Sequence, residues 1–152
     1  MSRKYRVAVG GTFEPLHEGH KRLIDKAIEL GGRDVTIGVT SDRMARQRIR
    51  SVLPFVIRAE NVKWYVRRKY GFEPYVVEIT TPYGKTLDYD FEYLVVSPET
   101  YEMAKRINEK RREMGKKEIK IVRVDFVLAD DNEPISATRI KKGLIDRYGR
   151  II

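Results

Sequence analysis

The two histidines of this 152-residue chain, His17 and His20, lie within one four-residue window. An apolar stretch at 5–9 and the pair Gly10-Gly11 precede them, and apolar residues at three- and four-residue spacing follow. We therefore expect a strand at 5–9, a tight turn, and a helix over about 17–30. The start of such a helix carries free backbone N–H groups and the positive end of the helix dipole, which attract phosphate. Two imidazoles three residues apart share one helix face there.

Three interpretations of the histidine pair are compatible with its spacing. The imidazoles are exposed and have no role, they bind a metal with a third ligand from elsewhere, or they donate hydrogen bonds to a nucleotide phosphate. The pair is one residue short of the H-E-x-x-H spacing of metalloproteases, so Glu18 is misplaced for that chemistry. Because Gly10, Gly11 and Thr12 stand a few residues before the window, we favour the phosphate clamp.

A second candidate phosphate site lies near the C-terminus, in the segment Ser136-Ala137-Thr138-Arg139-Ile140-Lys141-Lys142. Ser136 is a typical residue to cap a helix, which we expect over 137–148. The first turn of an ordinary capped helix tends to hold acids, which complement the dipole. Here it holds a hydroxyl and cations, so we favour triphosphate binding over an ordinary helix with a basic face.

The composition favours anionic partners, because 31 Lys and Arg against 22 Asp and Glu give a formal charge of +9. The absence of cysteine excludes disulfides and thiolate zinc sites. The sequence contains no apolar run of membrane-spanning length and no signal-peptide core, so we expect a cytoplasmic protein without a membrane partner. The basic run 105–120 is interleaved with glutamates and lacks aromatic residues, which favours a solvated surface over nucleic-acid binding.

The elements that must position these residues alternate along the chain. We expect strands over residues 5–9, 34–39, 75–79, 93–97 and 119–127, with helices between them and a last helix after the fifth strand. The first two strands and their helix form a β-α-β unit, hence a parallel pair with a right-handed crossover. The sequence therefore predicts one doubly wound α/β domain over residues 1–152. Ligands of such sheets bind outside the carboxyl ends of the strands, where both candidate segments and Thr40-Ser41-Asp42 fall.

Two motifs resemble the signature of the nucleotidylyltransferase superfamily. Gly11-Thr12-Phe13 followed by His17-Glu18-Gly19-His20 is similar to its G-T-F…H-x-G-H motif, and Ile135-Ser136-Ala137-Thr138 to its I-S-x-T motif. The chain length, the start Gly10–His17 and the segment Ser97-Pro98-Glu99-Thr100 resemble the archaeal phosphopantetheine adenylyltransferase family, which is related to the eukaryotic coenzyme A synthase domain. The resemblance covers essentially the whole chain.

This resemblance implies a Rossmann-like five-stranded parallel sheet and an enzyme of coenzyme A biosynthesis. The implied reaction moves the adenylyl group of ATP, accompanied by Mg²⁺, to 4′-phosphopantetheine and yields dephospho-coenzyme A and pyrophosphate. It implies that Thr12 contacts the acceptor phosphate and the α-phosphate, and that His17 and His20 hold the ATP phosphates, with His20 stabilising the transition state. The implied nucleotide-binding residues also include Gly11, Phe13, Gly19, Ser136, Thr138, Arg139 and Lys141.

Other assignments stay open at the level of sequence. Arg46 and Arg48 are both candidates for the cation that holds the acceptor phosphate, and the spacing does not choose between them. No residue is singled out as a metal ligand, and the ligands of Mg²⁺ stay open. Sibling transferases that use nicotinamide mononucleotide, or CTP with glycerol phosphate or phosphocholine, share the signature. A basic nucleic-acid-binding module is the alternative from another class, but it leaves the histidine window unexplained. The oligomeric state is open, and a monomer is compatible with the sequence.

Overall fold

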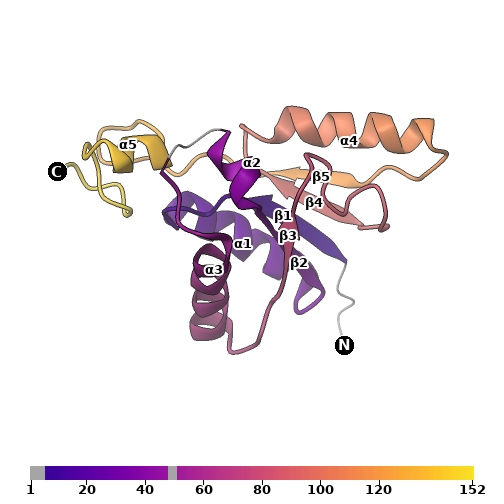
Figure 1. Ribbon diagram of the computed structural model, residues 1–152, viewed down its shortest axis with the longest axis horizontal. Coiled ribbons are helices and arrows are strands. Elements are labelled where there is room, and N and C mark those ends of the chain that lie inside the picture. Colours follow the sequence, from indigo (N-terminus) through magenta and orange to yellow (C-terminus); the bar gives the residue numbers. More distant parts are fainter. Residues whose placement is uncertain (1–5, 48–50) are drawn as a thin grey trace.

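The structure is a computed structural model that describes residues 6–47 and 51–152. Five parallel strands form one sheet in the order β3-β2-β1-β4-β5 (Figure 1). Their bounds are β1 (Val7–Gly11), β2 (Val35–Thr40), β3 (Tyr75–Ile79), β4 (Tyr93–Val96) and β5 (Lys120–Arg123). The strand order reverses between β1 and β4, the place where doubly wound sheets bind ligands. The predicted Rossmann-like parallel sheet is confirmed.

Helices cover both faces of the sheet. The helices α1 (Glu18–Gly31) and α3 (Phe55–Tyr70) pack on one face, and α4 (Tyr101–Glu113) packs on the other, over β4 and β5 (Figure 1). Successive side chains of a strand point to opposite faces. In β1, Val7 and Val9 belong to the core under α1 and α3, whereas Ala8 belongs to the cluster under α4. No helix within the described ranges is long and apolar enough to span a membrane.

The elements differ from the sequence prediction mainly at four places. The first strand continues through Gly10 and Gly11, which we expected to form the turn after it, because both residues pair with β2. The last helix, α5 (Ala137–Lys141), is much shorter than predicted, because Gly143 adopts a left-handed conformation with φ 75° and ends the helix. The fifth strand ends at Arg123 rather than 127, since its partner β4 ends opposite it at Val96. The short helix α2 (Asp42–Arg46) was not predicted, because five residues carry too little periodicity to reveal an apolar face.

Candidate active site at the carboxyl ends of the strands

The histidine pair closes the start of α1. His17 is the N-cap residue, and its Nδ1 accepts hydrogen bonds from the backbone N–H groups of Gly19 at 3.0 Å and His20 at 3.4 Å. In return, Nδ1 of His20 accepts from the backbone N–H of His17 at 3.3 Å. The two rings stack with their centroids 3.7 Å apart. A third first-turn donor, the N–H of Glu18, reaches the carbonyl oxygen of Arg147 at 3.3 Å.

These contacts change how the start of α1 can hold a phosphate. The sequence predicted free backbone N–H groups at this point, and that prediction is wrong for the N–H groups of residues 18, 19 and 20, which already have acceptors. The two imidazole rings supply further N–H groups at this corner, and the His20 ring also has a backbone hydrogen bond to Pro15. Because Nδ1 of each neutral ring accepts a backbone hydrogen bond, its proton lies on Nε2, and each Nε2–H is a donor.

Both histidines are neutral at physiological pH. Burial lowers the pKa of His17 to about 4. Burial also lowers the pKa of His20 to about 3, helped by the charge of the adjacent His17 and opposed by a backbone hydrogen bond to Pro15. Close stacking is favourable for two neutral rings, whereas two imidazolium ions at this distance would repel one another.

Gly19 and Phe13 shape the space around the histidines. A Cβ atom on Gly19 would lie 2.8 Å from Cε1 of His17, so a side chain at this position would displace the capping ring. Phe13 is fully buried, and the edge of its ring meets His20 with a centroid distance of 5.2 Å. A Cβ atom on Gly11 would approach the same Phe13 ring to 3.2 Å. The absence of a side chain at Gly19 and Gly11 therefore makes room for the rings of His17 and Phe13, respectively.

Lys141 of α5 is tied to this corner by a partly buried ion pair. Its Nζ donates to the two carboxylate oxygens of Glu14 at 2.9 and 3.1 Å and to the carbonyl oxygen of Ser51 at 2.8 Å. Glu14 also accepts from the backbone N–H of Leu53 at 3.3 Å. The structure thus brings Lys141 next to the histidine turn. Glu14 was not singled out in the sequence, and its spacing gave no signal for this role.

The other predicted residues of the second motif lie on α5 itself. Ser136 caps the helix, and its Oγ accepts from the N–H of Arg139 at 3.2 Å. Arg139 donates to the carbonyl oxygen of Pro134 at 2.9 Å and forms an ion pair with Asp131. Thr138 is exposed. Arg139 and Lys141 therefore each have a carboxylate partner in this structure.

The two arginines proposed for the acceptor phosphate differ in what the structure says of them. Arg46 is exposed at the end of α2, directly after β2, and its positive charge contributes to lowering the pKa of Asp42, after the larger effect of the hydrogen bond from Arg58. Arg48 lies outside the described residues. Arg46 therefore lies at the edge of the sheet where the strands end.

Thr12 stands at the end of β1, where two neighbouring strands bring hydroxyl groups together. Its Oγ1 accepts a hydrogen bond from Oγ1 of Thr40, at the end of β2, at 3.0 Å. The backbone oxygen of Thr12 accepts from the buried guanidinium of Arg58 at 3.1 Å. Sequence reasoning missed Arg58. The available signal was its position four and eight residues before Val62 and Val66, on the buried face of α3.

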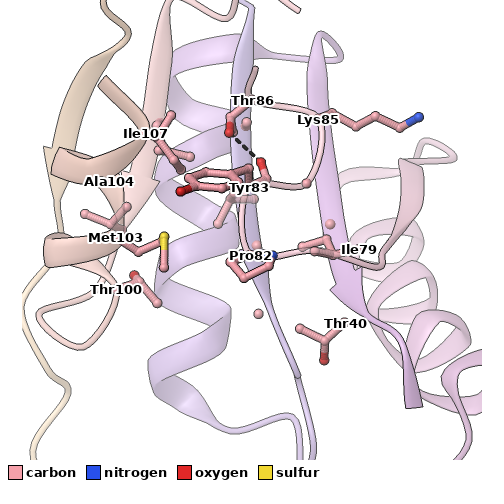
Figure 2. A pocket seen from close by; sticks show the side chains of 18 of the residues that line it. Thr40, Ile79, Pro82, Tyr83, Lys85, Thr86, Thr100, Met103, Ala104 and Ile107 are labelled. Atoms are coloured by element: carbon pink, nitrogen blue, oxygen red, sulfur yellow. Dashed lines mark hydrogen bonds between the residues drawn. The ribbon is translucent and has the colours of Figure 1, made fainter. Parts of the chain in front are cut away.

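An apolar cavity of about 370 Å³ opens beside Thr12, on the sheet face that carries α4 (Figure 2). Figure 2 shows one wall formed by Met103, Ala104 and Ile107 of α4, and another by Ile79, Pro82 and Tyr83. The floor consists of small residues of the strands, namely Ala8, Gly10, Thr36 and Gly38. A Cβ atom on Gly38 would lie 2.5 Å from Cδ1 of Ile79, so glycine allows the Ile79 side chain to lie against this floor. The sequence did not reveal this cavity.

No cluster of three or more His, Cys, Asp or Glu side chains suitable for a metal occurs among residues 6–47 and 51–152. The donor set around Thr12 and the histidines consists of hydroxyl and imidazole groups. These groups suit phosphate oxygens, which accept hydrogen bonds from O–H and N–H donors.

The model of the cytidylyltransferase-like family matches residues 8–143, and the chain belongs to this family. A curated relative from Archaeoglobus fulgidus, named phosphopantetheine adenylyltransferase, is 77% identical over 147 residues, which cover 97% of this chain and 99% of that protein. Another of the same name, from Methanosarcina mazei, is 48% identical over 150 residues, 96% of each. Within the family, the chain therefore belongs with the phosphopantetheine adenylyltransferases, as the sequence motifs predicted.

A solved structure supports the fold independently. The crystal structure of a protein with unknown function from Archaeoglobus fulgidus matches with a TM-score of 0.78 and 80% sequence identity. The match covers 79% of this chain and 89% of that chain. The arrangement of sheet and helices described above is thus shared with an experimentally determined structure.

Proposed function

We propose that this chain transfers the adenylyl group of ATP to 4′-phosphopantetheine, giving dephospho-coenzyme A and pyrophosphate. Membership of the family and the names of its relatives support this reaction. The chain then catalyses a step of coenzyme A biosynthesis.

The observation that carries the choice of acceptor is the apolar cavity beside Thr12. Phosphopantetheine has a phosphate at one end and a long uncharged arm at the other. A cavity of about 370 Å³ with Met103, Ile107 and Tyr83 in its walls suits such an arm, while the hydroxyl of Thr12, which also lines it, suits the phosphate. Nicotinamide mononucleotide, glycerol phosphate and phosphocholine are smaller or charged at the far end, and burying an unpaired charge there would be unfavourable.

The reaction needs no general base. A phosphate monoester has a second pKa near 6, so it is largely a dianion at neutral pH and is already a nucleophile. One of its oxygens forms a bond to the α-phosphorus of ATP, and the bond from that phosphorus to the bridging oxygen breaks. Pyrophosphate leaves with the electron pair. The protein has to align two anions and disperse negative charge in the transition state.

The residues of the corner suit that task. We assign the neutral Nε2–H groups of His17 and His20 to the ATP phosphates, with His20 on the oxygens where charge develops in the transition state. Thr12 donates to the acceptor phosphate and the α-phosphate. The β- and γ-phosphates are assigned to Ser136, Thr138, Arg139 and Lys141. Arg139 and Lys141 then exchange Asp131 and Glu14, respectively, for phosphate oxygens.

Two further assignments complete the proposal. Arg46 or Arg48 neutralises the acceptor phosphate at the end of β2. Mg²⁺ accompanies ATP and is held by phosphate oxygens and water, as this ion commonly is at nucleotide sites, where it neutralises charge on the phosphates.

Pyrophosphate release by the purified protein tests this function. With Mg²⁺ present, ATP and CTP are each combined with 4′-phosphopantetheine, nicotinamide mononucleotide, glycerol 3-phosphate and phosphocholine. We expect release only from ATP with phosphopantetheine. The variant His20→Ala serves as the control for contaminating enzymes, and we expect its kcat to fall much further than its KM for ATP rises.

Other outcomes would contradict the proposal in distinct ways. Release with another nucleotide and acceptor would keep the phosphate clamp and assign the chain to a sibling transferase. The absence of pyrophosphate release from every mixture would favour a basic nucleic-acid-binding module. Steeply salt-dependent binding to RNA or DNA would then identify such a module.

A further inference from the structure

Arg58 is a fully buried arginine, with 0% of its surface exposed, that contacts the turn carrying Thr12. Its Nη1 donates to the backbone oxygen of Thr12 at 3.1 Å and to Oγ1 of Thr40 at 3.2 Å. Its Nε donates to the carbonyl oxygen of Leu53 at 2.7 Å, and its Nη2 donates to the carboxylate of Asp42 at 2.9 Å. One guanidinium thus connects the ends of β1 and β2, the helix α2, and the segment before α3.

The direction of the hydrogen bonds in this network is set by Arg58. A guanidinium can only donate, and it remains charged at any pH that the fold survives. Oγ1 of Thr40 must therefore accept from Arg58, and its own O–H is left to donate to Oγ1 of Thr12, 3.0 Å away. Oγ1 of Thr12 accepts that bond. Its own hydrogen is consequently directed elsewhere.

We propose that Arg58 is a positioning residue, which acts through Thr40 to make the Thr12 hydroxyl a hydrogen-bond donor toward the substrate phosphate. The proposal rests on the adenylyl transfer proposed above. A hydroxyl that accepts from one neighbour and donates to a phosphate matches both of its hydrogen-bonding capacities. Without the bond from Thr40, the Thr12 hydroxyl can donate to the Thr40 oxygen or to water instead, and it then presents a lone pair to an anion.

The charge balance around the network supports this role. Asp42 offsets the buried positive charge, and the hydrogen bond from Arg58 lowers the pKa of its carboxyl. The buried charge of Arg58 is therefore balanced by the protein itself and needs no substrate phosphate as its partner. Hydrogen bonds in such a chain also polarise one another, so the charge at Arg58 strengthens the donor that Thr12 offers.

A pair of substitutions at Thr40 separates the hydroxyl from the shape of the side chain. Thr40→Val removes the hydroxyl and keeps the volume, whereas Thr40→Ser removes a methyl group and keeps the hydroxyl. We expect Thr40→Val to lower kcat at least about tenfold, and Thr40→Ser to remain within about twofold of the wild type. Melting temperatures of both proteins, recorded alongside, report any loss of folded structure.

A double-substitution cycle then tests whether Thr40 acts through Thr12. In the Thr12→Val background, we expect Thr40→Val to cause no further loss of kcat, because its target hydroxyl is already absent. If the two losses multiply instead, Thr40 acts independently and the proposal is overturned.

A second comparison tests Arg58 itself against a matched buried arginine. Arg111 of α4 is 1% exposed and donates to the carbonyl oxygens of Thr86, Tyr89 and Lys117 and to Asp90. We expect Arg58→Lys and Arg111→Lys to lower the melting temperature comparably, while only Arg58→Lys lowers kcat at saturating substrates. Equal kcat for both variants would overturn the proposal.

The wild-type protein distinguishes the two possible failures. If the wild type releases no pyrophosphate from ATP and phosphopantetheine, the proposed function fails, and the role of Arg58 fails with it. If the wild type is active but Thr40→Val and Thr40→Ser have the same kcat, only the role of Arg58 and Thr40 is overturned.

Discussion

His17 and His20 illustrate how far residue types lead before a structure is known. Their spacing and the preceding glycines predicted a phosphate-binding corner, and the structure brings them together with Thr12 and Phe13 in one turn. The stacking of the rings and the use of Nδ1 as a backbone acceptor were beyond prediction. Those features depend on burial and on the rotamers of both rings, which local sequence does not specify.

Gly19 provides a test of this arrangement at the scale of one residue. Alanine favours a helix over glycine by up to about 1 kcal/mol, but displacing the His17 ring removes cap hydrogen bonds worth about 0.5–2 kcal/mol, so Gly19→Ala should lower the melting temperature slightly. Its Cβ would meet the His17 ring at 2.8 Å and shift it, so we expect kcat to fall by more than about tenfold. Steady-state kinetics and thermal unfolding check both expectations.

The matched control introduces alanine at an exposed position of the same helix. Arg22→Ala should leave kcat near the wild-type value. An active Gly19→Ala protein would show that the position of the His17 ring does not matter for turnover.

At the scale of elements, the sequence predicted every strand of the sheet because each strand is a short apolar run between turn residues. It was less successful where an element depends on a neighbour. The fifth strand can pair only as far as β4 extends, and α5 stops at a glycine whose left-handed conformation is not encoded by periodicity. The following segment instead forms an antiparallel bridge between Ile145 and Ile151.

The ion pair between Lys141 of α5 and Glu14, in the turn between β1 and α1, joins two segments that lie far apart in the sequence. Removing Lys141 leaves the nearly buried carboxylate of Glu14, with 9% of its side chain exposed, without an opposite charge. We expect Lys141→Met to lower the free energy of unfolding by about 1–3 kcal/mol, less than for a fully buried pair because the lysine is partly exposed. Adding Glu14→Gln should recover part of that loss. Urea-induced unfolding of both single variants and the double variant measures the coupling.

An exposed ion pair of the same chain is the reference for that experiment. Lys105 and Glu102 lie 2.9 Å apart on the surface of α4, and such pairs contribute little. Lys105→Met should leave the urea midpoint of unfolding essentially unchanged. Additive effects of the substitutions at Glu14 and Lys141 would show that the pair does not anchor α5.

At the scale of the whole molecule, the chain has two histidines; His17 is buried, His20 is partly buried, and both are neutral at physiological pH. Their pKa values are near 6.5 in the unfolded chain and are lowered to about 4 and about 3 in the folded protein. Between these pKa values the unfolded state binds more protons than the folded state. The contribution of the histidines to the free energy of unfolding is therefore complete above pH 6.5 and declines as the pH falls below it.

We therefore expect the free energy of unfolding to be lower at pH 5 than at pH 7 by on the order of 3 kcal/mol. Urea-induced unfolding at both pH values measures it. The double variant His17→Asn, His20→Asn should lose most of this dependence, since ordinary carboxyl groups titrate mainly below this range. The same dependence in the double variant would contradict the assignment to the histidines.

The two faces of the sheet differ in how completely the chain covers them. The helices α1 and α3 fill one face, whereas α4 and the loop at 80–90 leave a cavity on the other. Under the proposed function, the pantetheine arm occupies the place where a larger protein would pack its own side chains. The bound acceptor then completes the hydrophobic core on this face of the sheet. Binding of the correct acceptor and full packing of the core therefore occur together.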